Sequence, residues 1–165
     1  MTFILRWPAV LVLFALVALC VLAAVSAGAA IAGYQAPITQ VQDVQAEAAA
    51  AGAAEMTWLD VGLWGAAALF FLIAAVRLIR RTQGFWVWLL GFAAYGGRWA
   101  YQQGQDVITQ FQAIDWGVFQ EPQKLLAEAG SFEVQVALLA VILIVGVFIA
   151  IIDGADRAYW DKQGA

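Results

Sequence analysis

The chain has 165 residues, of which 64% are hydrophobic and only 12% are charged, and its mean hydropathy is +0.82. A soluble domain of this length could not bury so large an apolar fraction, so the composition excludes an ordinary water-soluble fold. The net charge is −4. Its acidic residues lie mainly between apolar blocks, so this charge does not imply an acidic-tail function.

The apolar residues form four blocks, each close to the ~20 residues that cross a hydrocarbon core roughly 30 Å thick. The blocks cover residues 7–32, 59–79, 85–101 and 134–152. They predict an all-α integral membrane protein, a four-helix bundle in a single membrane domain that spans residues 1–165. The segments between and after the blocks are an outer loop at 33–57, an inner turn at 80–84, an outer loop at 102–131 and a cytoplasmic tail at 153–165.

The first block resembles a secretory signal peptide in two respects, because Arg6 precedes it and small residues end it. Its apolar stretch is longer than the about 7–15 residues of a signal-peptide core, so we expect it to be retained as a helix. Cys20 lies within this block, followed by more apolar chain. We interpret it as a small apolar core residue.

The second and third blocks are joined by only five residues, Arg80 to Gly84, which predicts an antiparallel hairpin. Thr57 and Asp60 fit a capping box at the start of the second helix, with Asp60 accepting from the Thr57 backbone N–H. The third block is short and contains Arg98. An interfacial or re-entrant helix is therefore the alternative to a crossing, and it would move the C-terminus to the other side.

The loop at 102–131 alternates polar and apolar residues, a spacing that favours a surface position. Pro122 follows Glu121 and Gly130 follows Ala129, and Pro is tolerated at the start of a helix whereas Gly commonly follows its end. We therefore expect a short interfacial helix at 121–129, with Leu125 and Leu126 facing lipid or protein.

Basic residues predict the orientation, because cytoplasmic loops carry an excess of Lys and Arg. With the N-terminus inside, the outer side receives only Lys124 and the helix-end Arg98. The inner side receives Arg6, Arg77, Arg80, Arg81, Arg157 and Lys162. The expected topology is therefore N-in and C-in, in a bacterial-type inner membrane.

The chain has no His, one Cys, and only Met1 and Met56 as thioethers. A His-ligated haem or chlorophyll is therefore excluded, as is catalysis by a Ser-His or Cys-His pair. The glycines near Gly97 lack the spacing of a phosphate-binding loop. We expect no enzyme activity, no metal site and no nucleic-acid partner, while a non-covalent contact with a lipid, quinone or carotenoid stays compatible with the sequence.

Arg98 is the one charged residue of the third block, which makes it a functional candidate. It lies ~24 Å from the 80–84 turn at 1.5 Å per residue, near the outer interface. Snorkelling to headgroups or pairing with Asp60 on the adjacent helix are the structural readings. The functional reading is an outward-facing site for an anionic headgroup or polar ligand, formed by Arg98 with Tyr95, Tyr101, Gln102 and Asp60.

Aromatic and small residues suggest contact surfaces. Most of the eight Trp residues fall at expected membrane interfaces. A candidate apolar docking surface comprises Phe70, Phe71, Phe85, Trp88 and Phe92. Small residues at helical spacing, where backbones can approach closely, are candidates for helix packing. They are Gly146, Ala150 and Gly154 in the fourth block, Gly28 in the first and Gly97 in the third.

Two functions follow from these observations. The first is a non-catalytic accessory or scaffold subunit of a larger inner-membrane protein complex, with respiratory and photosynthetic assemblies as candidate hosts and other integral membrane subunits as partners. The alternative is a small transporter or a lipid- or hydrophobic-ligand-binding protein with its site around Arg98. The lack of an acid at the centre of any block weighs against ion-driven transport.

Overall fold

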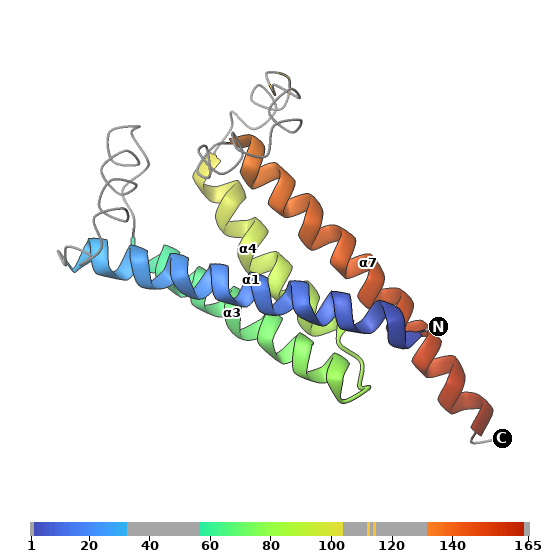
Figure 1. Ribbon diagram of the computed structural model, residues 1–165. Coiled ribbons are helices and arrows are strands. Elements are labelled where there is room, and N and C mark those ends of the chain that lie inside the picture. The colour runs from blue at the N-terminus through green and yellow to red at the C-terminus, as the bar shows by residue number, and fades with distance from the viewer. Residues whose placement is uncertain (1, 33–56, 104–111, 113, 115–131, 164–165) are drawn as a thin grey trace.

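A computed structural model describes residues 2–32, 57–103, 112, 114 and 132–163. These residues form four helices and no strand (Figure 1). The helices are α1 (Thr2–Ile31), α3 (Trp58–Ile79), α4 (Phe85–Gln103) and α7 (Phe132–Gln163). The expected helix at 121–129 and most of both outer loops lie outside the described residues.

Three of these helices are long and apolar enough to span a membrane, namely α1, α3 and α7. Their candidate spans are Leu5–Ala29, Trp58–Ile79 and Val134–Asp161. The helix α4 is not among them, and its sequence carries Arg98, Gln102 and Gln103 within 19 residues. The all-helical prediction is therefore confirmed, whereas a fourth crossing stays a prediction.

Two helices are longer than the apolar blocks indicate. The helix α1 begins at Thr2 and runs through Pro8. The helix α7 continues past Ile152 to Gln163, so most of the segment expected as a tail is helical. Helix formers such as Ala155, Arg157 and Ala158 continue the helix after the apolar block has ended.

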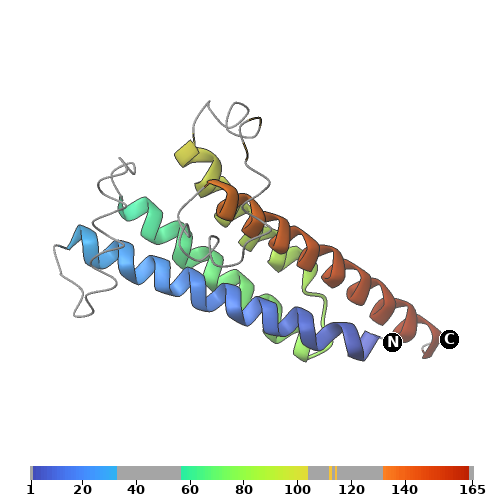
Figure 2. The ribbon, with the colours of Figure 1, turned by 45° about the horizontal axis from the view of Figure 1, so that its top comes forward.

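The four helices contact one another in a ring, in the order α1, α3, α4, α7 and back to α1. The start of α1 and the end of α7 lie at the same end of the molecule (Figures 1 and 2). The 80–84 turn between α3 and α4 belongs to this end, because polar contacts join it to α7. We call this the Arg6 end, and the opposite end, where α3 begins and α4 finishes, the Arg98 end.

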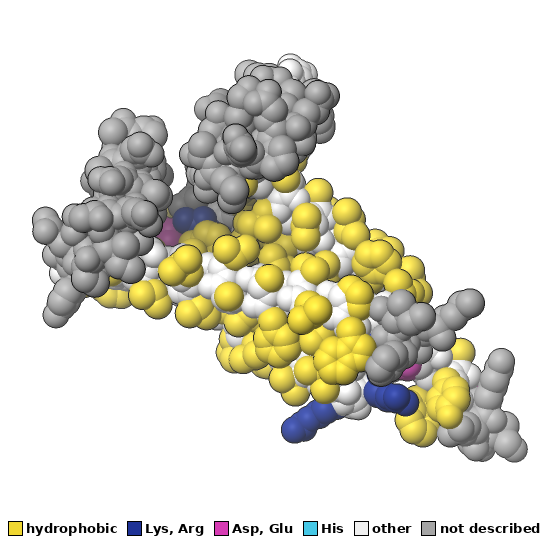
Figure 3. Space-filling model, in the orientation of Figure 1, with side chains coloured by type: hydrophobic (Ala, Val, Ile, Leu, Met, Phe, Trp, Pro, Cys, Tyr) yellow, Lys and Arg dark blue, Asp and Glu magenta, His cyan; other side chains and the backbone are white. Residues whose placement is uncertain are grey.

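The core is apolar and is contributed by all four helices. Leu13, Phe71, Ile142 and Ile149 are fully buried within it. Other apolar side chains cover the outside, and yellow side chains dominate the face in Figure 3 while dark blue and magenta atoms appear toward its two ends. So extensive an apolar exterior suits contact with lipid or with other membrane helices.

Two glycines allow close contact between helices. A Cβ at Gly146 would overlap the indole of Trp88, so Gly146 of α7 provides the space for this side chain of α4. A Cβ at Gly91 would lie only 2.8 Å from the Phe71 ring. Gly146 therefore packs within the bundle, and Gly91 is a packing residue that the sequence analysis missed.

The other expected packing glycines do not make such contacts. A Cβ added at Gly28, Gly97 or Gly154 would have no heavy-atom neighbour within 4 Å, and Ala150 is exposed. Ala150 and Gly154 therefore do not pack within the bundle with Gly146, and contact of this face with another subunit stays a prediction. The buried face of α7 follows Ile142, Val145, Ile149 and Ile152, so Gly146 falls beside it while Ala150 and Gly154 turn outward.

The expected aromatic docking surface is largely internal. Phe71 and Trp88 are buried, and Phe85 and Phe92 pack against the core. The Trp88 ring stacks between Phe85 and Phe92, with centroid distances of 5.5 and 5.6 Å. Phe70 is half-buried. These aromatics fill the space around Gly146 and Gly91 and do not form an open surface for a partner.

Candidate functional site

The first polar cluster lies at the Arg98 end and joins α3 to α4. Arg98 Nε lies 3.1 Å from Asp60 Oδ1, and the two side chains are only 12% and 7% exposed. The Arg98 guanidinium also lies over the Trp64 ring, with its Cζ 4.4 Å from the ring centroid. An ion pair and a cation–π contact thus hold the same cation against α3.

Asp60 is fixed from its other side by the start of its own helix. The Thr57 backbone N–H donates to Asp60 Oδ2 at 2.8 Å, and the Thr57 hydroxyl donates to the same oxygen at 3.0 Å. The predicted bond of the capping box is therefore present. With Arg98 on one oxygen and Thr57 on the other, the carboxylate is occupied by structural contacts.

The structure brings together part of the predicted ligand site. Arg98 and Asp60 pair, and Tyr95 is buried with its ring 5.2 Å from Trp64 in an edge-to-face contact. Tyr101 is 73% exposed, and the Gln102 side chain lies outside the described residues. Trp64 belongs to the cluster although the sequence analysis did not include it. These contacts hold α3 and α4 together, and they support a structural role for Arg98 more than an open ligand site.

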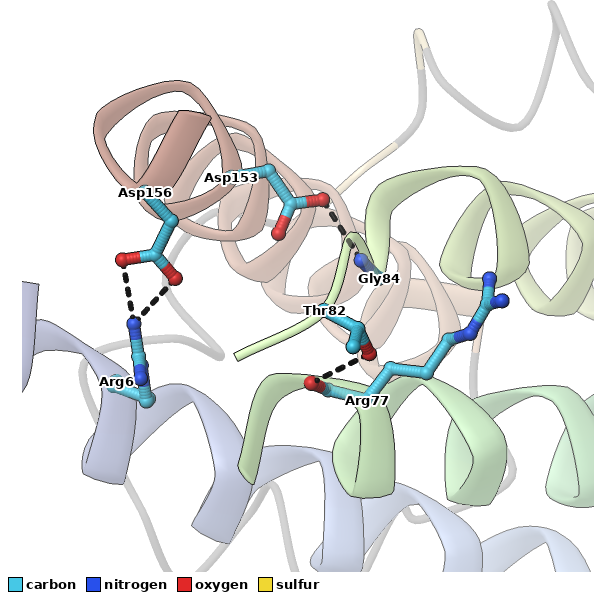
Figure 4. A network of polar contacts seen from close by, with 6 residues as sticks. All are labelled: Arg6, Arg77, Thr82, Gly84, Asp153 and Asp156. Carbon is cyan, nitrogen blue, oxygen red and sulfur yellow. Dashed lines mark hydrogen bonds and ion pairs between the residues drawn. The ribbon is translucent and has the colours of Figure 1, made fainter. Parts of the chain in front are cut away.

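A second polar cluster lies at the Arg6 end and joins the first helix to the last. Arg6 Nη2 donates to both carboxylate oxygens of Asp156, at 2.8 and 2.5 Å (Figure 4). The Arg6 side chain is 8% exposed and that of Asp156 is 20% exposed. This pair secures α1 against α7 over a sequence separation of 150 residues.

Asp153, one turn before Asp156, secures the start of α4. Its Oδ2 accepts from the backbone N–H of Gly84 at 2.8 Å (Figure 4). The same oxygen accepts from the backbone N–H of Phe85 at 2.9 Å. The first N–H groups of a helix have no partner within it, and a carboxylate there also complements the helix dipole. The cap of α4 thus comes from another helix.

Neither Asp153 nor Asp156 was identified from the sequence. Both follow the last apolar block, in the segment that the sequence predicts to be a tail. The available signal was helical periodicity, because Asp153 and Asp156 continue the spacing of the buried Ile149 and Ile152.

The end of α3 shows an unusual backbone at Arg81. The Arg81 N–H donates to the carbonyl of Leu78 at 3.2 Å, and the Thr82 N–H donates to the carbonyl of Arg77 at 2.9 Å. These two bonds form a Schellman motif with Arg81 at the left-handed position, where its φ is 56°. The Thr82 hydroxyl also donates to the Arg77 carbonyl, at 3.1 Å (Figure 4). Glycine is the usual residue at this position, because it has no Cβ.

Two pockets open at the Arg6 end. One, of about 180 Å³, lies between α1 and the end of α3 and is lined by Arg6, Trp7, Val10, Ile79 and Arg81. The other, of about 320 Å³, lies between the 80–84 turn and the end of α7. Its lining includes Asp153, Asp156 and Arg157. Polar groups and space therefore coincide at this end of the molecule.

Comparison with known proteins gives no relative. No protein-family model, no curated protein and no solved structure matches this chain. Within the described part of the chain there is also no group of three or more carboxylate or thiol side chains placed to hold a metal ion.

Proposed function

We propose that this chain is a non-catalytic scaffold subunit that associates side by side with other integral membrane proteins. The observation that carries the proposal is an exposed stripe along α4. Trp86, Leu90, Ala93, Gly97 and Ala100 repeat at alternating spacings of four and three residues, and all are exposed. Such spacing places them on one face of a helix, where the small residues would admit a neighbouring helix closely.

The composition of α4 supports a protein neighbour on this face. Of the four helices, α4 alone does not qualify as an independent span by length and apolarity among the residues described. Its opposite face carries the buried Trp88 and Tyr95 and the half-buried Arg98. A partner helix along the stripe would shelter the least lipid-compatible helix of the bundle.

The arrangement of charge supports a structural role. Arg98 is paired with Asp60, Arg6 with Asp156, and Asp153 with the backbone of α4. Each of these contacts joins two helices, as expected of groups that hold a bundle in one shape. The proposed setting is a bacterial-type inner membrane that all four helices cross, with both termini in the cytoplasm, as the excess of basic residues at the Arg6 end favours.

A pair of matched variants tests the proposal. Gly97→Leu adds a side chain to the stripe on α4, and Gly65→Leu adds one to an exposed site on α3 at a similar distance from the Arg98 end. Neither glycine has a heavy atom within 4 Å of its Cβ position, so both variants should fold. After purification in mild detergent, Gly97→Leu should lose a partner that the unaltered chain and Gly65→Leu retain. A chain that purifies alone in all three cases contradicts the proposal.

The topology is tested separately by labelling single cysteines in a Cys20→Ser background. A cysteine at position 82 should react only with a membrane-permeant reagent in intact cells, and one at position 47 should react with an impermeant reagent. The reverse pattern would overturn the N-in orientation.

A further inference from the structure

We infer that the pocket between α1 and the end of α3 binds the phosphate of an anionic phospholipid. This inference is independent of the proposed scaffold role. The pocket combines two arginines, Arg6 and Arg81, with the apolar side chains of Trp7, Val10 and Ile79. Arg6 and Ile79 lie near the ends of the candidate spans Leu5–Ala29 and Trp58–Ile79, the depth at which headgroups meet acyl chains.

The backbone at Arg81 is the first independent observation for this site. Arg81 adopts a φ of 56° at the position of the Schellman motif that glycine favours. A side chain with a Cβ is strained in this conformation, and such strain is concentrated at functional positions. The motif places an arginine, at a cost in backbone energy, on the wall of the pocket.

The second observation is an unsatisfied donor on Arg6. This residue is 7% exposed, and its Nε has no hydrogen-bond partner among the described atoms, although its Nη2 binds Asp156. Buried donors are nearly always paired. Trp88 and Arg98 also carry a buried donor without a hydrogen-bond partner, but of these three residues only Arg6 lines one of the two pockets. A phosphate oxygen is a suitable acceptor, because guanidinium groups bind phosphate through charge-assisted hydrogen bonds.

The lining of this pocket suits a singly charged ligand. Its two charged residues are Arg6, which Asp156 compensates, and Arg81, which forms no ion pair among the described residues but also lines the larger pocket with Asp153, Asp156 and Asp161. A phosphodiester such as that of phosphatidylglycerol carries one negative charge. The volume of about 180 Å³ is below the roughly 300 Å³ of a typical small-molecule site. It suits a headgroup whose acyl chains run outside along Val10 and Ile79, and Trp7 provides an interfacial anchor.

The experiment uses the full chain in nanodiscs of phosphatidylcholine alone or mixed in equal parts with phosphatidylglycerol. Thermal stability is followed in both, and native mass spectrometry of detergent-solubilised protein titrates bound phosphatidylglycerol. We expect phosphatidylglycerol to bind and to raise the melting temperature. Arg81→Gln should weaken its binding roughly tenfold through loss of a charge-assisted hydrogen bond. Arg80→Gln, a neighbouring exposed arginine outside this lining, should weaken it by no more than roughly twofold, because solvent and salt screen its charge.

Arg81→Gly separates binding from folding. Glycine relieves the backbone strain, so this variant should melt at a higher temperature than the unaltered chain in phosphatidylcholine, and yet it should lose the response to phosphatidylglycerol. If Arg80→Gln and Arg81→Gln weaken phosphatidylglycerol binding equally, general surface charge explains the binding and the proposed site is wrong. The last measurement adds inorganic phosphate to the protein in phosphatidylcholine nanodiscs. If it stabilises the protein in phosphatidylcholine as well as phosphatidylglycerol does, the ligand is soluble phosphate and the lipid assignment is wrong.

Discussion

The two ends of the bundle are held by the same kinds of contact but connect different parts of the chain. At the Arg98 end, the ion pair joins α3 to α4, which follow each other in sequence. At the Arg6 end, the contacts of Asp153 and Asp156 join the last helix to the α3–α4 turn and to the first helix. The Arg98 end therefore strengthens a local hairpin, whereas the Arg6 end closes the ring of four helices.

The comparison predicts that the Arg6 pair is the more sensitive of the two. In Arg6→Met, Asp156 loses the one partner described for it and becomes an uncompensated, mostly buried charge. The free energy of unfolding should fall by about 3–5 kcal/mol, toward the lower value because Asp156 is 20% exposed. Titration with SDS in mixed micelles measures this change. In Arg6→Met combined with Asp156→Leu much of the loss should be recovered, and a double variant as unstable as the single one would refute the role of the buried charge.

Arg98→Met should cost less, about 1–3 kcal/mol, the penalty for a buried polar group that loses one of its partners. Asp60 would still accept from the Thr57 backbone and hydroxyl, and it would remain in the favourable field at the start of α3. The same unfolding titration checks this value. A loss larger than that of Arg6→Met would reverse the ranking of the two ends.

The contact between Gly146 and Trp88, which lies between the two ends, tests how tightly the middle of the bundle is packed. Gly146→Leu must displace Trp88 and should destabilise the fold by about 1–3 kcal/mol through overpacking. Gly154→Leu is the matched control on the same helix, where no heavy atom lies within 4 Å of the Cβ position. Its stability should be unchanged within error. Equal melting temperatures for the two variants would show that Trp88 can move without cost.

The smallest effect is expected at the cap of α3. Thr57→Ala removes the hydroxyl donor to Asp60 but keeps the backbone N–H donor, so the loss should be about 0.5–1 kcal/mol. Thermal unfolding of the variant in detergent measures it. Thr57→Ser restores the hydroxyl and should recover most of the stability, whereas a Ser variant as unstable as Ala would point to the lost methyl group.

The sequence predicts the Arg98 end better than the Arg6 end for a physical reason. A five-residue turn forces α3 and α4 to be antiparallel neighbours, and the rise per residue then brings Asp60 and Arg98 to one level. No such constraint shows which helices flank α7. The partners of Asp153 and Asp156 depend on the order of helices around the ring, which long loops leave open.

The packing of α7 illustrates a second limit. The four-residue spacing of Gly146, Ala150 and Gly154 does predict that they lie near one another on the helix surface. It does not show which side faces the core, since nearly every side of this helix is apolar. The bulky Ile142, Ile149 and Ile152 are buried in the core. Gly146 lies beside them, where the absence of a side chain leaves space for the Trp88 ring.

The cap that Asp153 provides for α4 has a consequence for the order of synthesis. A chain is made from its N-terminus, but the acceptor of the Gly84 N–H lies 69 residues further along the sequence. The acceptor of Arg6 lies 150 residues further along. Until the last helix is inserted, one buried cation and the first turn of α4 lack their partners. Before α7 is made, α1, α3 and α4 therefore lack these polar contacts, and a chain that ends before Asp153 would leave the Arg6 guanidinium and the first turn of α4 without the partners described here.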